Sequence, residues 1–512
     1  MLKKIYGSAI FGVEATTITV EVNITSGIGY HLVGLPDNAI KESNYRIAAA
    51  LQNNGFKIPG KKITINMAPA DLRKEGSAYD LTLATGILVA SNQIKAEGLE
   101  DYLIMGELSL DGTLQPIRGA LPIAIKAREE GFKGFILPAK NAREAAVVND
   151  LKVYGASTIL DVVAHFNGDK YIKETEIDTR EEFCKHLNLP EYDFADVKGQ
   201  ESIKRCMEIA AAGGHNIILI GPPGSGKTML AKRLPSILPP MTLNEALETT
   251  KIHSVVGRVK DDSGLLTQRP FRSPHHTISD VALVGGGTYP QPGEISLSHN
   301  GVLFLDELPE FKRSVLEVMR QPLEDREVTI SRAKFTVTYP SSFMLVASMN
   351  PSPSGYFNDP DSPLRSSPAE MQRYLGKISG PLLDRIDIHV EVTPVPFDKL
   401  SEERRGESSL AIRERVSKAR DVQTLRFRGD TGVHYNAQMG SKQIGDYCKL
   451  DKGSLDLLKS AMAKLNLSAR AYDRILKVAR TIADLDEKAA IDASHISEAI
   501  QYRSLDREGW LG

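Results

Sequence analysis

The stretch NIILIGPPGSGKT, Asn216–Thr228, decides the fold. Its apolar half predicts a buried strand, its glycine-rich half predicts a loop, and a helix is expected directly afterwards. Glycines allow backbone N–H groups to surround phosphate oxygens without interference from side chains. A lysine then neutralises the β- and γ-phosphates, and the following hydroxyl holds Mg²⁺. The loop is therefore predicted to bind ATP with Mg²⁺ through Gly221, Pro222, Pro223, Gly224, Ser225, Gly226, Lys227 and Thr228.

Two further strands end in polar residues of the kind that phosphate chemistry needs. The strand Gly301–Leu305 ends in Asp306 and Glu307, of which the first suits Mg²⁺ and the second suits polarising the attacking water. An acidic pair that leaves a strand is often only solvated charge, but the glycine-rich loop upstream favours the catalytic interpretation. The strand SFMLVAS ends near Asn350, whose amide can position the same water or simply form a turn before Pro351.

Composition sets the limits within which these motifs operate. The 512 residues are too many for one core, and 25% charged with 41% hydrophobic residues is typical of a soluble globular protein of two or three domains. The net charge of −2 gives no indication of nucleic-acid binding, although a basic channel is compatible with it. Cys184, Cys206 and Cys448 lie singly, as expected in a reducing cytoplasm. No signal peptide or membrane-spanning segment is predicted, so we expect a cytoplasmic protein without a membrane partner.

The pattern along the chain predicts four segments. Residues 1–166 read as α/β, because apolar residues alternate in strands such as Ile18–Ile24 and helical patterns follow them. Residues 167–190 are polar and charge-rich, which indicates a linker. Residues 191–395 contain the motifs above and predict a nucleotide-binding α/β core. Residues 396–512 carry apolar residues at helical spacing and predict a helical lid domain.

The run RPFRSPHHTISDVALVGGGTYPQPGEISLSHNGVLFLDELPEF, Arg269–Phe311, resembles the magnesium-chelatase-like AAA+ family, specifically its YifB/ComM group. The resemblance continues through RYLGKISGPLLDRIDIHVEV, Arg373–Val392, and covers nearly the whole chain. The segment GELSLDGTLQPIRGALPIAIKARE, Gly106–Glu129, looks like the proteolytic domain of Lon protease. The implied fold class is α/β, with a Lon-protease-like α+β domain, an AAA+ P-loop core around a parallel sheet, and a C-terminal helical lid. The resemblance also implies a homo-hexameric ring.

Three residues gain roles from this resemblance. Arg385 sits where such motors place the arginine that reaches the γ-phosphate of a neighbouring subunit. Arg470 corresponds to a second sensor supplied from the lid, and Asn350 corresponds to the first sensor. Each arginine also fits an ordinary ion-paired surface position. An arginine that acts on a neighbour implies an oligomer, because no subunit then holds a complete site.

The resemblance also implies an insertion within residues 271–299 and a hairpin near Val328–Pro340. In related ring motors such hairpins point into the pore. Arg332 and Lys334 lie near the expected tip and are candidates for contacts with a DNA backbone, or else charges on a solvated hairpin end. His275–His276 lack the further ligands that a metal site needs, which favours a structural or pore-loop role.

A first departure from the family concerns zinc. Many relatives carry a cluster of four cysteines in the stretch that follows Asn350. The matching positions here are Ser352, Ser354, Leu364 and Ser366, and none of these side chains can replace a thiolate. The sequence therefore predicts no zinc site.

A second departure concerns proteolysis. The place of the Lon catalytic serine falls at about Ala78 and that of its lysine at about Leu121, while Ser77 is one position off. Without a nucleophile and its amine base there is no acyl transfer. The N-terminal domain is therefore predicted to be catalytically inactive and to serve as a scaffold or a DNA-positioning collar.

The leading hypothesis for function is an ATPase that remodels DNA. The resemblance implies a hexameric branch-migration helicase whose partners are branched or single-stranded DNA. The alternative is a chelatase- or MoxR-like ATPase that remodels a protein partner, which an aromatic pore residue in place of Arg332 and Lys334 would favour. An ATP-dependent protease is disfavoured by the missing Ser–Lys pair, and a magnesium chelatase subunit proper is disfavoured by the Lon-like domain.

Overall fold

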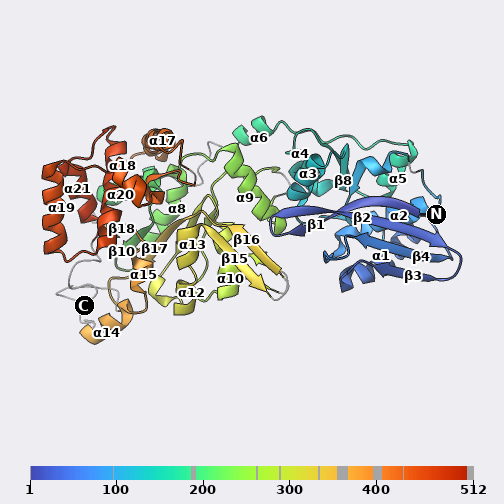
Figure 1. Ribbon diagram of the computed structural model, residues 1–512, viewed down its shortest axis with the longest axis horizontal. Coiled ribbons are helices and arrows are strands. Elements are labelled where there is room, and N and C mark those ends of the chain that lie inside the picture. Colours follow the sequence, from blue (N-terminus) through green and yellow to red (C-terminus); the bar gives the residue numbers. More distant parts are fainter. Residues whose placement is uncertain are drawn as a thin grey trace. The chain divides into compact units, whose positions relative to one another are not determined.

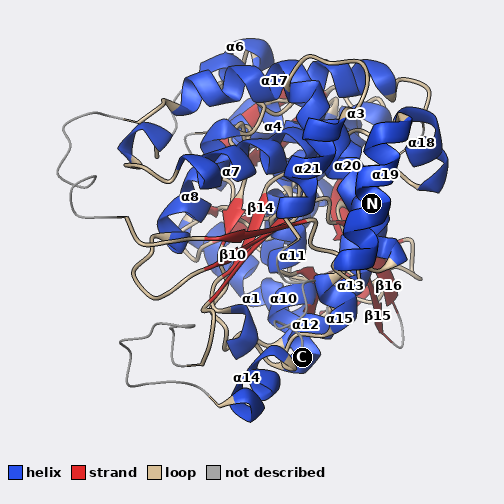
Figure 2. Ribbon diagram, turned by 90° about the vertical axis from the view of Figure 1, so that its left-hand side faces the viewer, coloured by secondary structure: helices blue, strands red, loops and turns tan. Residues whose placement is uncertain are grey.

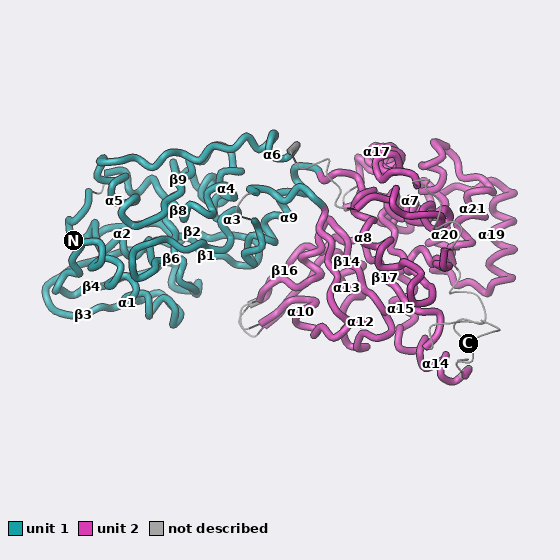
Figure 3. The backbone as a smooth tube through the Cα atoms, turned by 180° about the vertical axis from the view of Figure 1, so that it is seen from behind, with its two compact units in different colours: residues 1–187, 242–268 teal, residues 188–241, 269–512 magenta. Residues whose placement is uncertain are grey.

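The computed structural model describes residues 2–95, 97–185, 192–260, 263–287, 290–332, 335–353, 367–395, 406–430 and 432–503. The chain forms two compact units, the first made of residues 1–187 with 242–268 and the second of residues 188–241 with 269–512 (Figure 3). The chain thus leaves the second unit after residue 241 and returns to it at residue 269. The predicted boundaries placed 242–268 inside the nucleotide-binding core, whereas the structure assigns them to the first unit.

A seven-stranded sheet organises the first unit, in the order β3-β4-β2-β1-β5-β8-β9 (Figure 1). The predicted alternation is confirmed in β2, Glu14–Thr25, where Ile18, Val20 and Val22 are fully buried. The sequence pattern did not predict β1, Leu2–Phe11, which pairs antiparallel with β2 along its whole length. The other strands of this unit, including the short pair β6 and β7, are β3 Gly29–Val33, β4 Lys62–Ala68, β5 Tyr102–Ile104, β6 Glu107–Leu108, β7 Leu114–Gln115, β8 Gly134–Pro138 and β9 Lys152–Ala156.

The helices of the first unit include one from the later segment. α9, Leu243–Val255, packs against α3, Ala120–Glu129. The Ser254 hydroxyl donates to the buried Glu144 carboxylate, and the Gly119 N–H donates to the Ser254 carbonyl at 2.9 Å. These buried polar contacts explain why 242–268 belong to this unit. The remaining helices are α1 Asn38–Asn53, α2 Asp80–Ala90, α4 Ala139–Ala146, α5 Ile159–Asn167 and α6 Thr179–Lys185, the last lying within the predicted linker.

Five parallel strands form the sheet of the second unit, in the order β11-β14-β17-β10-β18. The strand before the glycine-rich loop, β10, Ile217–Ile220, lies between β17, Met344–Met349, and β18, Ile388–Glu391. β14, Val302–Leu305, and the short β11, Phe271–Arg272, complete the sheet. The predicted parallel core is confirmed. Because all strands run the same way, residues that follow them gather at one edge and residues that precede them gather at the other.

Helices that precede and follow the P-loop in the chain form much of this unit (Figure 2). α7, Glu201–Gly213, and α8, Lys227–Ile237, contact each other, and α17, Ser409–Arg426, contacts both of them. Apolar residues of the strands and of α20, Ala469–Leu485, belong to one buried cluster, so the lid helices share the core of the P-loop sheet. Other helices are α14 Pro368–Leu375, α15 Gly380–Leu383, α18 Ser441–Tyr447, α19 Lys452–Lys464 and α21 Ala493–Gln501.

The predicted hairpin is confirmed as β15, Glu327–Arg332, and β16, Phe335–Pro340, which pair antiparallel with Arg332 opposite Phe335 at the closed end. One of its faces is buried, and the other exposes Thr329, Ser331, Thr336 and Thr338. Before it come α10 Asp280–Val284, β12 Gly285–Gly286, β13 Gln291–Pro292, α11 Glu294–Leu297, α12 Arg313–Glu317 and α13 Arg320–Asp325. Within the described ranges, no helix has both the length and the apolar character needed to cross a bilayer.

Candidate active site

The glycine-rich loop joins β10 to α8, which begins at Lys227. Gly224 and Gly226 have φ values of +78° and +90°, a left-handed region in which a side chain is unfavourable. Consecutive turns of this kind point backbone N–H groups toward one spot, and the start of a helix adds a favourable field for an anion. The loop therefore has the shape and the polarity of a phosphate cradle.

The Lys227 ammonium lies in the middle of this cradle. It donates to the carbonyl oxygens of Gly221 and Pro222 at 2.7 and 2.9 Å, and to the Asn350 side-chain oxygen at 3.2 Å. Burial lowers the pKa of Lys227, and the nearby carboxylates of Asp306 and Glu307 oppose that shift. Lys227 is only 8% exposed, so its charge acts in a region from which water is mostly excluded.

Three oxygen-bearing side chains meet beside the cradle. The Thr228 hydroxyl donates to the Asp306 carboxylate at 2.8 Å, and the Ser348 hydroxyl donates to the second oxygen of the same carboxylate. A hydroxyl and a carboxylate are the oxygen ligands that Mg²⁺ accepts beside a nucleotide. Ser348 was not predicted as a site residue; its position in the strand beside Asp306 is a long-range pairing that local sequence patterns do not reveal.

Glu307 follows Asp306 in a left-handed conformation, with φ of 54°. This conformation is uncommon for a residue with a side chain, and here the Glu307 N–H is fixed by the Ser348 hydroxyl at 3.1 Å. The side chain is exposed at the carboxyl edge of the sheet, as a group that polarises water requires. The Asn350 carbonyl accepts a hydrogen bond from the Tyr374 hydroxyl at 3.1 Å, which anchors the residue next to Lys227.

Arg385 lies at the other edge of the sheet. It precedes β18, and its carbonyl accepts from the side chain of Asn216, the residue before β10, at 2.9 Å. The strand β10 has four residues, so this edge is about 13 Å from the cradle at about 3.3 Å per residue. Arg470 lies with Arg385 rather than with the cradle, because its guanidinium pairs with Asp384 at 2.6 Å.

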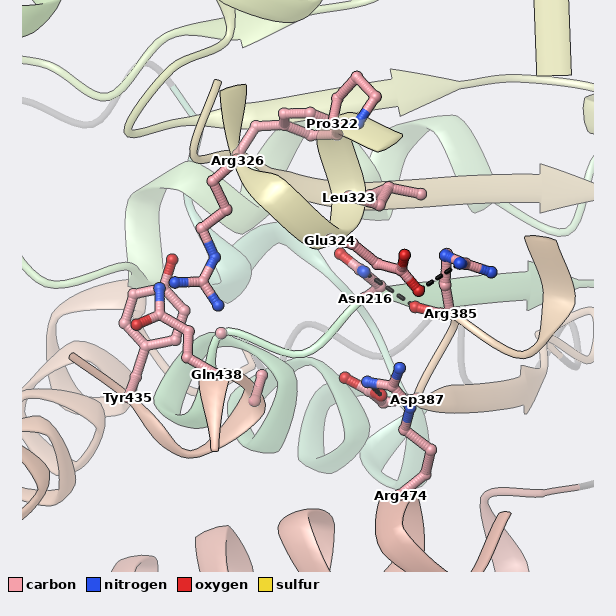
Figure 4. Close-up of a pocket in the computed structure, with 13 residues that line it drawn as sticks. Asn216, Pro322, Leu323, Glu324, Arg326, Arg385, Asp387, Tyr435, Gln438 and Arg474 are labelled. Carbon is pink, nitrogen blue, oxygen red and sulfur yellow. Dashed lines mark hydrogen bonds and ion pairs between the residues drawn. The ribbon is translucent and has the colours of Figure 1, made fainter. Parts of the chain in front are cut away.

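A pocket of about 60 Å³ opens at this amino edge (Figure 4). Arg326, Arg385 and Arg474 line it together with Glu324 and Asp387. Arg474 donates to Asp387 at 2.9 Å, and Asp387 in turn contacts the buried His215 at 3.0 Å. Positive charge holds the pKa of Asp387 well below its usual range despite the burial that raises it. The sequence reasoning singled out only Arg385 here, because the other groups come from distant parts of the chain.

Of the remaining predicted residues, the structure describes Arg332, His275 and His276. Arg332 is exposed at the end of β15, and Lys334 lies outside the described residues. The rings of His275 and His276 lie with centroids 4.1 Å apart and planes tilted by 34°, and no group of three or more potential metal ligands occurs in the described part of the chain.

The sequence predicted neither a zinc site nor a protease site, and the residues concerned are outside the cradle. Ser352 is buried, whereas positions 354, 364 and 366 lie outside the described residues. In the first unit, the Ser77 hydroxyl donates to the Glu107 carboxylate, and the buried Lys74 ammonium donates to the Pro69 carbonyl.

The P-loop after an internal strand of a five-stranded parallel sheet, the acidic pair after another strand of that sheet and the helical C-terminal segment define an AAA+ ATPase. Family models described as magnesium chelatase subunit ChlI match residues 193–400, 20–141 and, for its C-terminal part, 406–503. The chain belongs to the YifB/ComM family of magnesium-chelatase-like AAA+ ATPases.

Relatives align along almost the full length. The competence protein ComM of Haemophilus influenzae is 46% identical over 506 residues, which are 98% of this chain and 97% of that protein. The protein YifB of Escherichia coli is 44% identical over 511 residues, or 99% and 98% of the two chains. The Holliday junction branch migration complex subunit RuvB of Thermotoga petrophila is 24% identical over 321 residues, covering 61% of this chain and 79% of RuvB.

Proposed function

We propose that this protein is a ring-forming ATP hydrolase that uses ATP and Mg²⁺ to remodel DNA. One observation carries the proposal: the cradle around Lys227 and the arginine pair Arg385 and Arg470 occupy opposite edges of one sheet. Within one subunit the four-residue strand β10 keeps the cradle and the arginine pair apart. Adjacent copies in a closed ring would complete each site, and a homo-hexamer is the ring we propose.

The roles follow from the position of each group. Lys227 and the N–H groups of the loop would bind the phosphates, while Thr228 and Asp306 would hold Mg²⁺, which supplies charge neutralisation at the transferring phosphoryl group. Glu307 would take a proton from the attacking water, which Asn350 helps to position. Arg385 and Arg470 of the adjacent subunit would stabilise the charge that develops as the bond breaks.

Two observations support DNA as the substrate. The RuvB relative is named as a subunit of a branch migration complex, and the ComM relative is named as a competence protein. The hairpin β15–β16 exposes hydroxyls on one face, and the cationic Arg332 is exposed at its closed end on the opposite face. Hydroxyl and guanidinium groups are the usual partners of a phosphate backbone, and they read it without regard to sequence.

A protein substrate is the second candidate. The strand β16 begins with Phe335 in the sequence, and an aromatic residue near the closed end of the hairpin is what a ring that grips a polypeptide would need. The arginine beside it and the relationship to RuvB favour DNA over this alternative.

The deciding experiment measures ATP hydrolysis by the purified protein on four-way, forked and single-stranded DNA, together with branch migration of the four-way junction. We expect DNA to stimulate hydrolysis at least about fivefold at low salt and branch migration to require ATP. Glu307→Gln should abolish both while retaining ATP, and Glu310→Gln, at an exposed glutamate paired with Lys377, is the matched control. No binding at low salt and no stimulation would reject the DNA substrate, and stimulation by an unfolded protein instead would select the alternative.

A further inference from the structure

Arg385 is restrained by an acidic partner within its own chain. Its guanidinium forms an ion pair with Glu324 of α13 (Figure 4). It also donates to the Pro381 carbonyl at 2.5 Å. The Arg385 side chain is 13% exposed, whereas that of Glu324 is 59% exposed. The Nε atom of Arg385 is buried and has no hydrogen-bond partner among the described residues. The Arg385 guanidinium therefore has one donor, Nε, available for another acceptor, and its ion-pair partner Glu324 is exposed and can be replaced by another anion.

Glu324 lies immediately before the hairpin. α13 ends at Asp325, and a single residue, Arg326, separates it from the first residue of β15. Arg326 has a left-handed φ of 58°, and its carbonyl accepts from the N–H of Ser341, directly after β16, at 2.8 Å. Both strands of the hairpin are therefore anchored at Arg326, and a displacement of α13 reaches the hairpin without an intervening loop.

Arg326 is itself held by the lid. Its guanidinium donates to the Gly432 carbonyl at 3.1 Å and lies 6.0 Å from the centroid of the Tyr435 ring. Burial lowers the pKa of Arg326, with Tyr435 opposing that shift. The pocket at the amino edge therefore brings together Arg385, the root of the hairpin and the lid residue Tyr435 (Figure 4).

The hairpin is regularly paired along its whole length, as movement as a rigid body would require. Its six cross-strand pairs run without a bulge from Glu327 opposite Pro340 to Arg332 opposite Phe335. The Tyr339 hydroxyl, near the root, donates to the Pro290 carbonyl at 2.7 Å. At about 3.3 Å per residue, the strand β15 is a lever of about 17 Å between the root and Arg332.

We infer that Glu324 is a positioning residue that couples the nucleotide of the neighbouring subunit to the hairpin. Glu324 and the neighbour's phosphate compete for the guanidinium of Arg385. When Arg385 turns to the phosphate, Glu324 loses its partner and α13 with the hairpin root is released. By reciprocity, a substrate that holds the hairpin in the released position strengthens the grip of Arg385 on the neighbour's nucleotide. This inference rests on the proposed function, because it takes Arg385 to act between subunits.

The test compares two variants in a Glu307→Gln background, which keeps ATP bound in the ring. Glu324→Gln removes the partner of Arg385, and Glu317→Gln in α12 is the matched control, since Glu317 pairs with Arg320 at 2.9 Å. The readouts are amide hydrogen exchange of β15 and β16 and the affinity for four-way DNA, each with and without ATP. A melting curve verifies that both variants fold.

In the parent and in Glu317→Gln, we expect ATP to speed exchange of the hairpin amides and to change the affinity for DNA by about fivefold or more. In Glu324→Gln, both readouts should stay at the ATP-bound level whether or not ATP is present. An ATP response of Glu324→Gln equal to that of the parent would overturn the inference. A parent that binds ATP without any response of the hairpin would overturn it as well. Loss of the proposed function has a different signature, since Arg385→Ala in an otherwise wild-type chain would then hydrolyse ATP at the wild-type rate.

Discussion

The ammonium of Lys227 lies 3.2 Å from the amide oxygen of Asn350, which follows the neighbouring strand of the parallel sheet. Under the proposed function, the pair joins the group that would bind phosphate to the group that would position water. We expect Lys227→Ala to weaken ATP binding at least about 100-fold, because a charge-assisted contact of about 3 kcal/mol is lost. Titration with a fluorescent ATP analogue measures the effect. Lys232→Ala, on an exposed position of the same helix, should bind normally.

Asn350→Ala should separate binding from chemistry. We expect ATP affinity to change by less than about threefold, while kcat falls about 10- to 100-fold, because the water loses a positioning group. Steady-state hydrolysis with a parallel binding titration distinguishes the two effects. An unchanged kcat would assign Asn350 a purely structural role in holding Lys227.

Mixed assemblies test whether the arginines act between subunits. Arg385→Ala and Lys227→Ala should each be inactive alone. An equal mixture should recover about a quarter of the wild-type activity, because about one interface in four combines an intact cradle with an intact arginine. Arg470→Ala mixed with Lys227→Ala should recover activity in the same way, since Arg470 pairs with Asp384, the residue next to Arg385. Activity in neither mixture would place both arginines in the subunit's own site.

Arg332 should contribute to DNA affinity by charge alone. We expect Arg332→Ala to weaken DNA binding similarly for all sequences and to lower the salt dependence by about 0.9 in log–log slope for each phosphate contact removed. Fluorescence anisotropy over a range of salt concentrations measures this slope. Lys459→Ala, at an exposed position on α19, should leave it unchanged.

Lys477 makes the stability of the second unit depend on pH. It lies in α20, and burial lowers its pKa from 10.5 to about 8. Between these values the unfolded chain binds the additional proton, so the stability of the folded state rises with pH. Below pH 8 both states are protonated and the whole penalty remains. Relative to Lys477→Met, the wild type should gain about 2 kcal/mol of unfolding free energy between pH 8 and pH 10. Urea denaturation at both pH values measures the difference, and parallel curves for the two proteins would exclude a charged, buried Lys477.

Ser254 should be important for the stability of the first unit. Ser254→Ala removes a donor from the buried Glu144 carboxylate, whose pKa is raised by burial and lowered in part by this hydroxyl. We expect α9 to open more easily by about 1–3 kcal/mol, as measured by native-state hydrogen exchange of its amides. Ser460→Ala, at an exposed hydroxyl on α19, should change stability by no more than about 0.5 kcal/mol.

The cradle and its immediate partners were predictable from sequence because each follows a strand of one parallel sheet. Lys227, Asp306, Glu307 and Asn350 need only the direction of the strands to come together, and local apolar patterns indicate those strands. The placement of Arg470 was not predictable in the same way. Its contact with Asp384 joins α20 to the segment before β18, and the spacing of residues within a helix does not reveal that partner.

The first unit shows the same limit. The alternation in β2 predicted a strand, and the capping box of Thr242 with Glu245 marks the start of α9. Neither pattern indicates that α9 packs on α3, because the spacing of apolar residues shows which face of a helix is buried but not which element covers it. β1 was missed because its polar and apolar residues do not alternate strictly, and its burial comes from strands that lie on both sides.

The assignment of residues 242–268 to the first unit has a consequence for synthesis of the chain. The ribosome releases residues 2–187 first, but the helix that covers α3 emerges only after β10 and the P-loop helix have been made. At about 5–20 residues per second, the N-terminal residues wait several seconds for their last element. During that interval the face of α3 that α9 later covers is accessible to chaperones. The second unit is connected to both ends of segment 242–268, and when α9 has been made the sheet of that unit still lacks β11, β14, β17 and β18.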